Sequence, residues 1–192
     1  MGKKIFNSKH ILLLLLYSPG RSEEFNEPIE GRTRIIKSMF LFDKEVKKDF
    51  SRDTEVSLAE FFPWHYGPFS KEVYSDIEFF INNGFIEDTM LDTEKSEAEL
   101  DEAANWREDY VLDSDKSSDF EPRNEERFEL TTKGSDFTSE KIYSSLSENQ
   151  ILLLKTFKSK INSASLRSIL RYVYLKYPKY TSKSKIRGSF AY

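Results

Sequence analysis

Apolar residues in the first third of the chain form two helix-length patterns. The run at residues 11–17 is long enough to place apolar side chains on every side of a helix. We therefore predict a helix over residues 6–17 that is buried on most sides and capped by Asn7 or Ser8. A second helix is predicted from about residue 33 to residue 49, where apolar residues recur at helical spacing.

The segment 61–87 combines turn, helix and strand signals within a short length. Gly67 permits a sharp turn, and Pro68 suits the first turn of a helix, where its missing N–H is not needed. Five apolar residues then follow at helical spacing: Phe69, Val73, Ile77, Phe80 and Ile81. The dipeptide Asn83-Gly84 predicts a left-handed end to that helix, followed directly by a strand.

This strand requires an antiparallel partner, and residues 127–131 are the candidate, closed by Thr132, Lys133 and Gly134. The two strands predict a wing with a long acidic insertion between them at about residues 88–126. A helix followed by such a wing is how the recognition helix and wing of a winged-helix domain are arranged. The expected fold is therefore mainly α with a small β-wing, a winged helix-turn-helix-like domain elaborated by C-terminal helices.

The insertion and the C-terminal region complete the predicted organisation. A capping-box spacing predicts a short helix near residues 97–106 inside the insertion, and Ser147 and Ser165 have the positions of caps for two later helices. We expect residues 1–134 to form the winged-helix-like domain. Residues 135–192 then add C-terminal helices and a basic tail packed on the same domain.

Composition narrows the class of protein. The chain has 192 residues, enough for one domain with a small appendage, and 38% hydrophobic residues, enough for a core without disulfides. It contains no cysteine, which excludes disulfides, thiolate zinc sites and cysteine nucleophiles. Its N-terminal apolar run is far shorter than the ~20 residues that span a bilayer, and no small-residue cleavage site follows it. We expect a cytoplasmic protein with no membrane partner.

The net charge of −4 conceals a strong asymmetry along the chain. Residues 85–140 contain 19 acidic and 6 basic residues, whereas residues 141–192 contain 1 acidic and 11 basic residues. Such a separation indicates a polyanionic partner, pairing within the molecule or pairing between subunits. A merely solvated basic tail is the remaining interpretation.

Two short stretches resemble a known family. Residues 34–41, which read RIIKSMFL, look like the basic-apolar helix of the Panacea-type (SocA-like) domain, a family of antitoxins and adaptors. Residues 64–68, which read WHYGP and are followed by Val73 and Tyr74, resemble the aromatic–Gly–Pro signature of that family. The same elements resemble the YwgA-like proteins, and the end of the wing is similar to PadR-like winged-helix regulators. The resemblance covers under half of the chain and implies a winged-helix-like fold with a non-catalytic regulatory role.

The sequence carries no recognisable catalytic machinery. It has no Gly-rich phosphate loop, no Gly-x-Ser-x-Gly elbow and no Asp-rich metal signature. Its two histidines differ in context, His10 in an apolar helix and His65 in an aromatic turn, so we do not expect them to converge on a metal. We predict a protein that is not an enzyme and that needs no cofactor or metal.

Charge distribution moves the expected DNA contact away from the predicted recognition helix. Between positions 68 and 83 that helix carries one lysine against three acidic residues, which is unfavourable among phosphates. The C-terminal region interleaves basic residues with tyrosines, a pattern that suits phosphate contacts and base stacking. The leading hypothesis is a DNA-associated transcription regulator, acting as a dimer on two half-sites. Its candidate nucleic-acid-binding residues are Arg167, Arg171, Lys176, Lys179, Lys183, Lys185 and Arg187, together with Arg32, Arg34 and Lys37.

The alternative hypothesis is an antitoxin or adaptor that binds a partner protein, such as a toxin. Trp64, His65 and Tyr66 are the candidate contact residues, since aromatic clusters anchor many protein interfaces. The acidic surface of the predicted recognition helix is the second part of that interface. A packing corner that fixes the start of the next helix is the competing interpretation of the aromatic cluster, and it is the favoured one.

Overall fold

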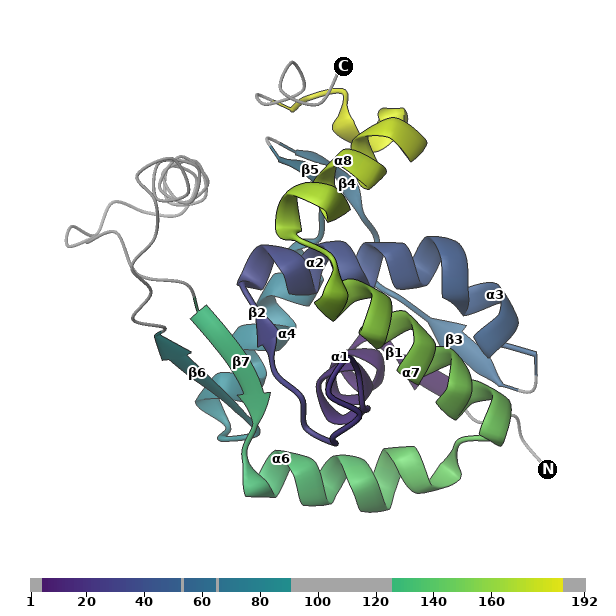
Figure 1. Ribbon diagram of the computed structural model, residues 1–192, viewed down its shortest axis with the longest axis vertical. Helices are drawn as coiled ribbons and strands as arrows, with labels where there is room; N and C mark the ends of the chain where they lie inside the picture. Colours follow the sequence, from purple (N-terminus) through teal and green to yellow (C-terminus); the bar gives the residue numbers. More distant parts are fainter. Residues whose placement is uncertain (1–4, 53, 65, 91–125, 185–192) are drawn as a thin grey trace.

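The computed structural model describes residues 5–52, 54–64, 66–90 and 126–184. Within these residues the protein is mainly helical with small sheets (Figure 1). The elements of the N-terminal half are β1 (Ile5–Asn7), α1 (Ser8–Tyr17), β2 (Ile29–Glu30), α2 (Arg32–Leu41), the π-helical turn η1 (Phe42–Val46), α3 (Lys47–Phe50), β3 (Glu55–Ser57), β4 (Phe62–Trp64), β5 (Gly67–Phe69) and α4 (Lys71–Asn82). The elements that follow are β6 (Ile86–Met90), β7 (Glu126–Leu130), α6 (Thr132–Phe137), η2 (Thr138–Ile142), η3 (Tyr143–Ser145), α7 (Glu148–Ser163), α8 (Leu166–Lys176) and η4 (Pro178–Thr181).

Helix α1 occupies the centre of the core, because its apolar run leaves no polar side to face water. Every residue from Ile11 to Leu16 is at most 1% exposed, and Figure 1 shows α1 surrounded by α2, α7 and α6. The predicted helix over residues 6–17 is confirmed from Ser8 onward. Asn7 caps it: its side-chain oxygen accepts from the N–H of His10, and Nδ1 of His10 accepts from the N–H of Asn7. Residues 5–7 instead form β1, which pairs in parallel with β3.

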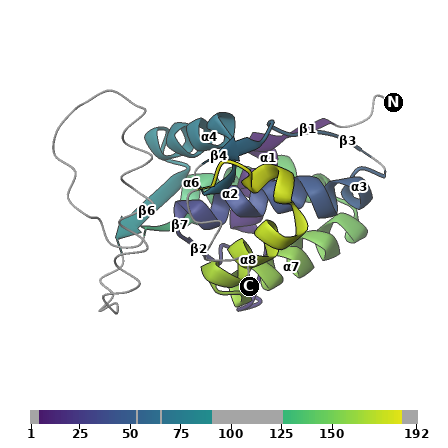
Figure 2. The same cartoon turned by 90° about the horizontal axis from the view of Figure 1, so that it is seen from above.

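The second predicted helix, over residues 33–49, is confirmed as a continuous helical segment made of α2, η1 and α3 (Figure 2). Ile36 and Phe40 are among its core residues, each at most 1% exposed. The apolar pattern does not reveal the π-helical turn η1. Such a turn inserts a residue into the helix and so changes the direction of the side chains that follow.

The predicted pairing of the two wing strands is confirmed. β6 and β7 are antiparallel, with Ile86 opposite Leu130 and Asp88 opposite Phe128. Gly84, at φ 68°, ends the preceding helix in the left-handed conformation that its sequence context predicts. Strand β2 adds to the other edge of β7, so the order in this sheet is β2–β7–β6. β2 is only two residues long, too short to show a periodic pattern, so the sequence does not indicate it.

The residues after β7 begin a helix, so the prediction that residues 132–134 close the wing is wrong. Thr131 caps α6 there: its Oγ1 accepts from the N–H of Gly134 at 3.1 Å. The helix approaches the chain before β6 so closely that a Cβ at Gly134 would lie 2.0 Å from the carbonyl oxygen of Phe85. Glycine is therefore required at this crossing.

The aromatic–Gly–Pro segment forms a hairpin rather than the start of a helix. β4 and β5 pair in antiparallel fashion, with Pro63 opposite Pro68. The prediction that Pro68 lies in the first helical turn is wrong, because Gly67, at φ 86°, reverses the chain into an extended strand. Helix α4 begins after Ser70, which caps it. The buried face of α4 contains predicted residues: Val73, Ile77 and Phe80.

The two C-terminal helices are confirmed together with their caps. Ser147 and Gln150 form the predicted capping box of α7, and Ser165 caps α8. Helix α7 contacts α1 and α3, and its Leu154 is fully buried in the core. Helix α8 contacts α2 and strand β5 (Figure 1).

Most of the acidic insertion, residues 91–125, lies outside the described residues, as does the short helix predicted near residues 97–106. The basic tail is described as far as Ser184, and residues 185–192 lie outside. No helix in the described part of the chain combines the length and the apolar composition that crossing a membrane requires.

Candidate nucleic-acid interface

The predicted basic surface lies on the C-terminal lobe, which we define as α8, η4 and residues 182–184. In Figure 1 this lobe stands with the β4–β5 hairpin at the top of the molecule, above α2. Ser165 fixes the start of α8, since its Oγ accepts a hydrogen bond from the N–H of Ser168 at 3.1 Å. At the other end, the N–H of Tyr177 donates to the carbonyl oxygen of Val173 at 2.8 Å.

The inner face of α8 holds the lobe on the body of the protein. Its buried side chains are Ile169, Leu170, Val173 and Tyr174. Leu170 and Tyr174 form a small apolar cluster with Tyr66 of the hairpin turn. Burial raises the pKa of the Tyr174 hydroxyl to about 12, even though this hydroxyl shares a hydrogen bond with Ser184. A Cβ at Gly67 would lie 3.3 Å from the Tyr174 ring, so the hairpin and α8 meet closely.

This packing corrects the prediction that Tyr66 contacts a partner. Tyr66 is 3% exposed, so its ring is used inside the molecule. Trp64 is half-buried and packs with Phe62 and Phe69, with ring centroids 5.8 and 6.4 Å away. His65 lies outside the described residues. The packing-corner interpretation of the aromatic cluster is therefore correct for Tyr66.

The outer face of α8 carries Arg167 and Arg171 four residues apart, and Lys179 lies beyond the end of this helix, in η4. All three are exposed, and so are Leu175 and Lys183. Within the described part of the chain, no carboxylate lies within 4.0 Å of the charged nitrogens of Arg167, Lys179 or Lys183. Among the described residues, these three exposed cations are therefore open to solvent rather than held in ion pairs.

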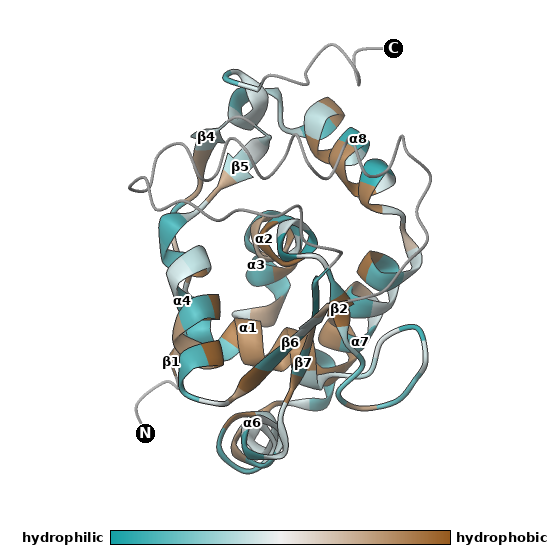
Figure 3. Ribbon diagram, turned by 90° about the vertical axis from the view of Figure 1, so that its left-hand side faces the viewer, coloured by the Kyte–Doolittle hydropathy of each residue, from teal (hydrophilic) through white to brown (hydrophobic). Residues whose placement is uncertain are grey.

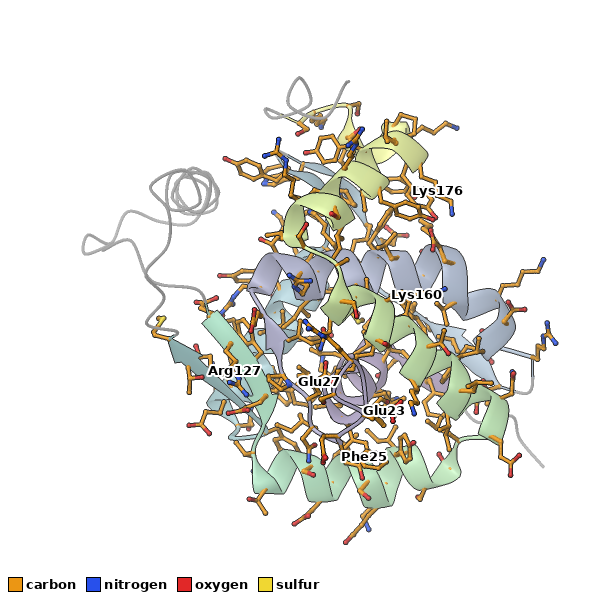
Figure 4. The ribbon with its side chains drawn as sticks, in the orientation of Figure 1. Glu23, Phe25, Glu27, Arg127, Lys160 and Lys176 are labelled. Atoms are coloured by element: carbon orange, nitrogen blue, oxygen red, sulfur yellow. The ribbon has the colours of Figure 1, made fainter. Side chains whose placement is uncertain are left out.

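Lys176 belongs to a different arrangement, centred on Glu45 of the π-helical turn. One oxygen of this carboxylate accepts hydrogen bonds from Lys176 Nζ at 2.9 Å and from the hydroxyls of Tyr172 and Tyr177, each at 2.8 Å. We call these four residues the Glu45 hub, and Figure 4 labels Lys176 at this junction. Through these hydrogen bonds the hub attaches the end of α8 to the π-helical turn η1. Lys176 is exposed but already paired with Glu45, so its predicted phosphate contact competes with this ion pair and stays a prediction.

The electrostatics of the hub match its geometry. Burial would raise the pKa of Glu45, but the hydrogen bonds from Lys176, Tyr172 and Tyr177 outweigh it and hold that pKa below its usual value. The hydrogen bond with Tyr172 and then the one with Glu45 raise the pKa of Lys176. Burial, followed by the hydrogen bond to Glu45, raises the pKa of the Tyr177 hydroxyl to about 12. The carboxylate thus stays ionised and the lysine stays charged.

Lys37 is also corrected as a phosphate contact, because it is 1% exposed. Its Nζ atom donates to the carbonyl oxygen of Pro68 at 2.8 Å, which places the ammonium group beneath strand β5. Burial lowers the pKa of Lys37 to about 7. This lysine supports the hairpin and cannot reach a ligand.

The two arginines of α2 likewise serve the fold. Arg32 forms ion pairs with Glu78 of α4 and, at 3.4 Å, with Glu126 of β7. Arg34 donates to the carbonyl oxygens of Ile161 and Ala164, at 2.7 and 2.6 Å, and so caps the end of α7 just before α8 begins. Their predicted role as phosphate contacts is therefore corrected. The remaining predicted contacts, Lys185 and Arg187, lie outside the described residues.

Sequence reasoning missed Glu45 altogether. Glu45 has no local signal, because its partners lie about 130 positions later in the chain. The pattern Tyr172, Lys176 and Tyr177 does place two hydroxyls and an ammonium on one side of a helix. That grouping is the one sequence feature that could have indicated a buried or shared acceptor.

The described residues contain no group of three His, Asp or Glu side chains placed to hold a metal ion. Their geometry defines a mainly helical protein with small sheets and an exposed basic helix. Compared with models of known protein families and with curated proteins, the sequence matches none.

Proposed function

We propose that this protein is a non-catalytic regulator that associates with DNA through its C-terminal lobe. The observation that carries the proposal is the exposure of three cations of the C-terminal lobe, Arg167, Lys179 and Lys183, which have no carboxylate partner within the described residues. The surrounding region, residues 141–192, contains one acidic residue against 11 basic ones. Cations displayed in this way gain affinity for the phosphate backbone by releasing its counterions. The proposal keeps the cytoplasmic location that the sequence leads us to expect.

The order of the elements supports a winged-helix-like arrangement for the body. Helices α1, α2 and α4 precede the β6–β7 hairpin, and β2 joins that hairpin to make a three-stranded sheet. Helix α4 then has the position of the recognition helix. Its exposed Glu72 and exposed Phe79 are poorly suited to a groove lined with phosphates. DNA therefore contacts α8 rather than α4.

The alternative function, an antitoxin or adaptor, has lost part of its support. Its aromatic contact surface depended on Tyr66, which is enclosed by Leu170 and Tyr174. Its acidic surface on α4 is exposed, but no observation of the described residues connects it with a toxin. DNA association is the function that the surface favours.

Fluorescence anisotropy with labelled random-sequence duplex DNA tests the proposal. We expect affinity to fall steeply between about 50 mM and about 200 mM salt, because each phosphate contact contributes about −0.9 to the logarithmic salt slope. Arg167→Gln and Lys179→Gln should each weaken binding and reduce that slope by about 1. Lys48→Gln, which removes an exposed cation from α3, is the matched control. No binding at low salt, or an equal loss in the control, would disprove the proposal.

A further inference from the structure

Tyr172 is the most exposed of the four tyrosines in the C-terminal lobe. Tyr174 is buried, and Tyr177 and Tyr180 pack on Phe40 of α2, with ring centroids 5.1 and 4.9 Å from that of the phenylalanine. Tyr172 is 41% exposed, and among the described residues no other aromatic ring contacts it. Contacts with phosphates make no use of an exposed aromatic ring, so they do not account for this side chain.

The Glu45 hub holds the ring of Tyr172 in place. The hydroxyl of Tyr172 donates to Glu45 at 2.8 Å, so the ring is fixed at one end by the helix backbone and at the other by this hydrogen bond. Lys176 Nζ lies 4.9 Å from the ring centroid and forms an ion pair with Glu45 at 2.9 Å, so the carboxylate beside the ring is already neutralised. A ring that is fixed in advance loses little side-chain freedom when a flat ligand stacks on it.

The exposed side of α8 places positive charge and an apolar side chain next to this ring. With about 3.6 residues per turn, Leu175 lies between Arg171 and Tyr172 around the helix, and Arg167 lies one turn before Arg171. Leu175 is 63% exposed, and Arg167 has no carboxylate within 4.0 Å among the described residues. Helices α4 and α8 lie on either side of α2, as Figure 3 shows, so the acidic residues of α4 do not face this side. A cation, an apolar side chain and an open ring therefore share one face.

A nucleotide with an unpaired base presents matching groups in the same order. Its phosphate is negative, its sugar is uncharged, and its base is a flat π-system. Every base can stack on an aromatic side chain, whatever the sequence. A base inside a duplex is already stacked on its neighbours, so a side chain on a helix cannot reach its face. The exposed side of α8 therefore suits a single strand better than a duplex.

We propose that the C-terminal lobe prefers single-stranded DNA and that an unpaired base stacks on Tyr172. Arg167 holds a phosphate of that strand, and Leu175 packs against the sugar and the edge of the base. The inference rests on the DNA association proposed above, and it names the form of DNA that the same surface takes. A duplex still binds through its phosphates but makes no use of the ring. Because a duplex has the higher charge density, cations alone would favour the duplex, and a preference for the single strand is the mark of stacking.

Fluorescence anisotropy with a labelled single strand, and with the duplex of the same sequence, tests the inference at two salt concentrations. We expect the wild type to bind the single strand more tightly, by a ratio that grows with salt, because salt weakens phosphate contacts but not stacking. Tyr172→Ala should bind the single strand at least about fivefold more weakly than Tyr172→Phe does. Both variants lose the hydrogen bond to Glu45, so this difference measures the contribution of the ring. The matched control Phe137→Ala removes a ring of α6 that is 39% exposed, and it should keep the wild-type preference.

Photocrosslinking of the wild type locates the contact. A single strand in which iodouracil replaces thymine should crosslink to Tyr172, as mass spectrometry of the digested protein would show. Circular dichroism of each variant verifies that it is folded. Three results would overturn the stacking and leave the DNA association standing: a wild type without the single-strand preference, equal affinities of the two Tyr172 variants, or no crosslink at Tyr172. A wild type that binds neither form of DNA would overturn the DNA association, and the stacking with it.

Discussion

Lys158 donates a hydrogen bond from its buried Nζ atom to the carbonyl oxygen of Leu16, at 2.9 Å. The same atom donates to the carbonyl oxygen of Glu27 at 2.5 Å. The last carbonyl groups of a helix have no partner within it, so this ammonium group satisfies the end of α1 and fastens the loop after it. The Glu27 side chain, labelled in Figure 4, accepts in turn from the N–H of Ser22 and from Asn162 of α7.

This burial predicts that stability rises with pH above neutrality. Burial, only partly offset by the charge of Glu27, lowers the pKa of Lys158 in the folded protein from 10.5 to about 7. Below pH 7 both the folded and the unfolded chain hold the proton. Between about pH 7 and 10.5 only the unfolded chain holds it, so the free energy of unfolding increases by up to about 1.4 kcal/mol per pH unit. Urea unfolding of the wild type and of Lys158→Met at several pH values measures how much the free energy of unfolding increases with pH. This increase should be smaller in the variant.

Two companion variants make the pH test specific. Lys37→Met should also flatten the pH dependence, because burial lowers the pKa of Lys37 to about 7 in the same way. Lys160→Met changes an exposed lysine of the same helix as Lys158 and should keep the wild-type slope. If Lys158→Met keeps that slope as well, the buried ammonium group is not its source.

Glu45→Gln should strengthen DNA association. The glutamine oxygen can still accept from the hydroxyls of Tyr172 and Tyr177, but the charge that pairs with Lys176 is lost. One more cation then becomes available on α8, and the logarithmic salt slope should steepen by about 0.9. Anisotropy at several salt concentrations measures the change. Glu148→Gln, an exposed charge change on α7, should have no such effect, and equal slopes in both variants would contradict a specific role for the hub.

Gly134→Ala should be strongly destabilising. The added Cβ would lie 2.0 Å from the carbonyl oxygen of Phe85, so α6 or the chain before β6 must move. We expect a loss of about 2–4 kcal/mol in the free energy of unfolding. Gly84→Asn, at φ 68° with open space around it, should cost less than about 1 kcal/mol because asparagine tolerates that conformation. Urea unfolding of both variants compares the two costs, and similar values would contradict the close approach.

Local signals predict much of this fold because they act within a few residues of the chain. The capping box at Ser147 and Gln150 begins α7 where its sequence predicts, and the glycine at 84 ends α4. The pairing of β6 with β7 also follows from short patterns, although 35 residues separate the strands. Each of these features can be predicted from a short stretch of sequence, without knowing what packs against it.

The candidate site is less predictable, because the role of a cation depends on what packs over it. Lys37 and Arg167 look alike as basic residues beside apolar ones. Lys37 is covered by a hairpin 31 residues later in the chain, whereas Arg167 faces solvent. Arg34 depends in the same way on α7, whose carbonyl groups lie 127 and 130 positions away. Contacts with distant parts of the chain therefore decide which cations remain exposed to bind phosphate and which are used to support the fold.

Tyr66→Ala distinguishes a core role for the aromatic turn from a role in partner binding. Tyr66 is 3% exposed and packs with Leu170 and Tyr174, so its removal leaves a cavity between the hairpin and α8. Truncation of a buried aromatic side chain costs about 3–5 kcal/mol, and we expect urea unfolding of this variant to show a loss in that range. Tyr172→Ala removes a tyrosine of similar size that is 41% exposed, and it should cost distinctly less. Equal and small losses in both variants would mean that the ring of Tyr66 contributes little to packing, and its assignment to the core would then be wrong.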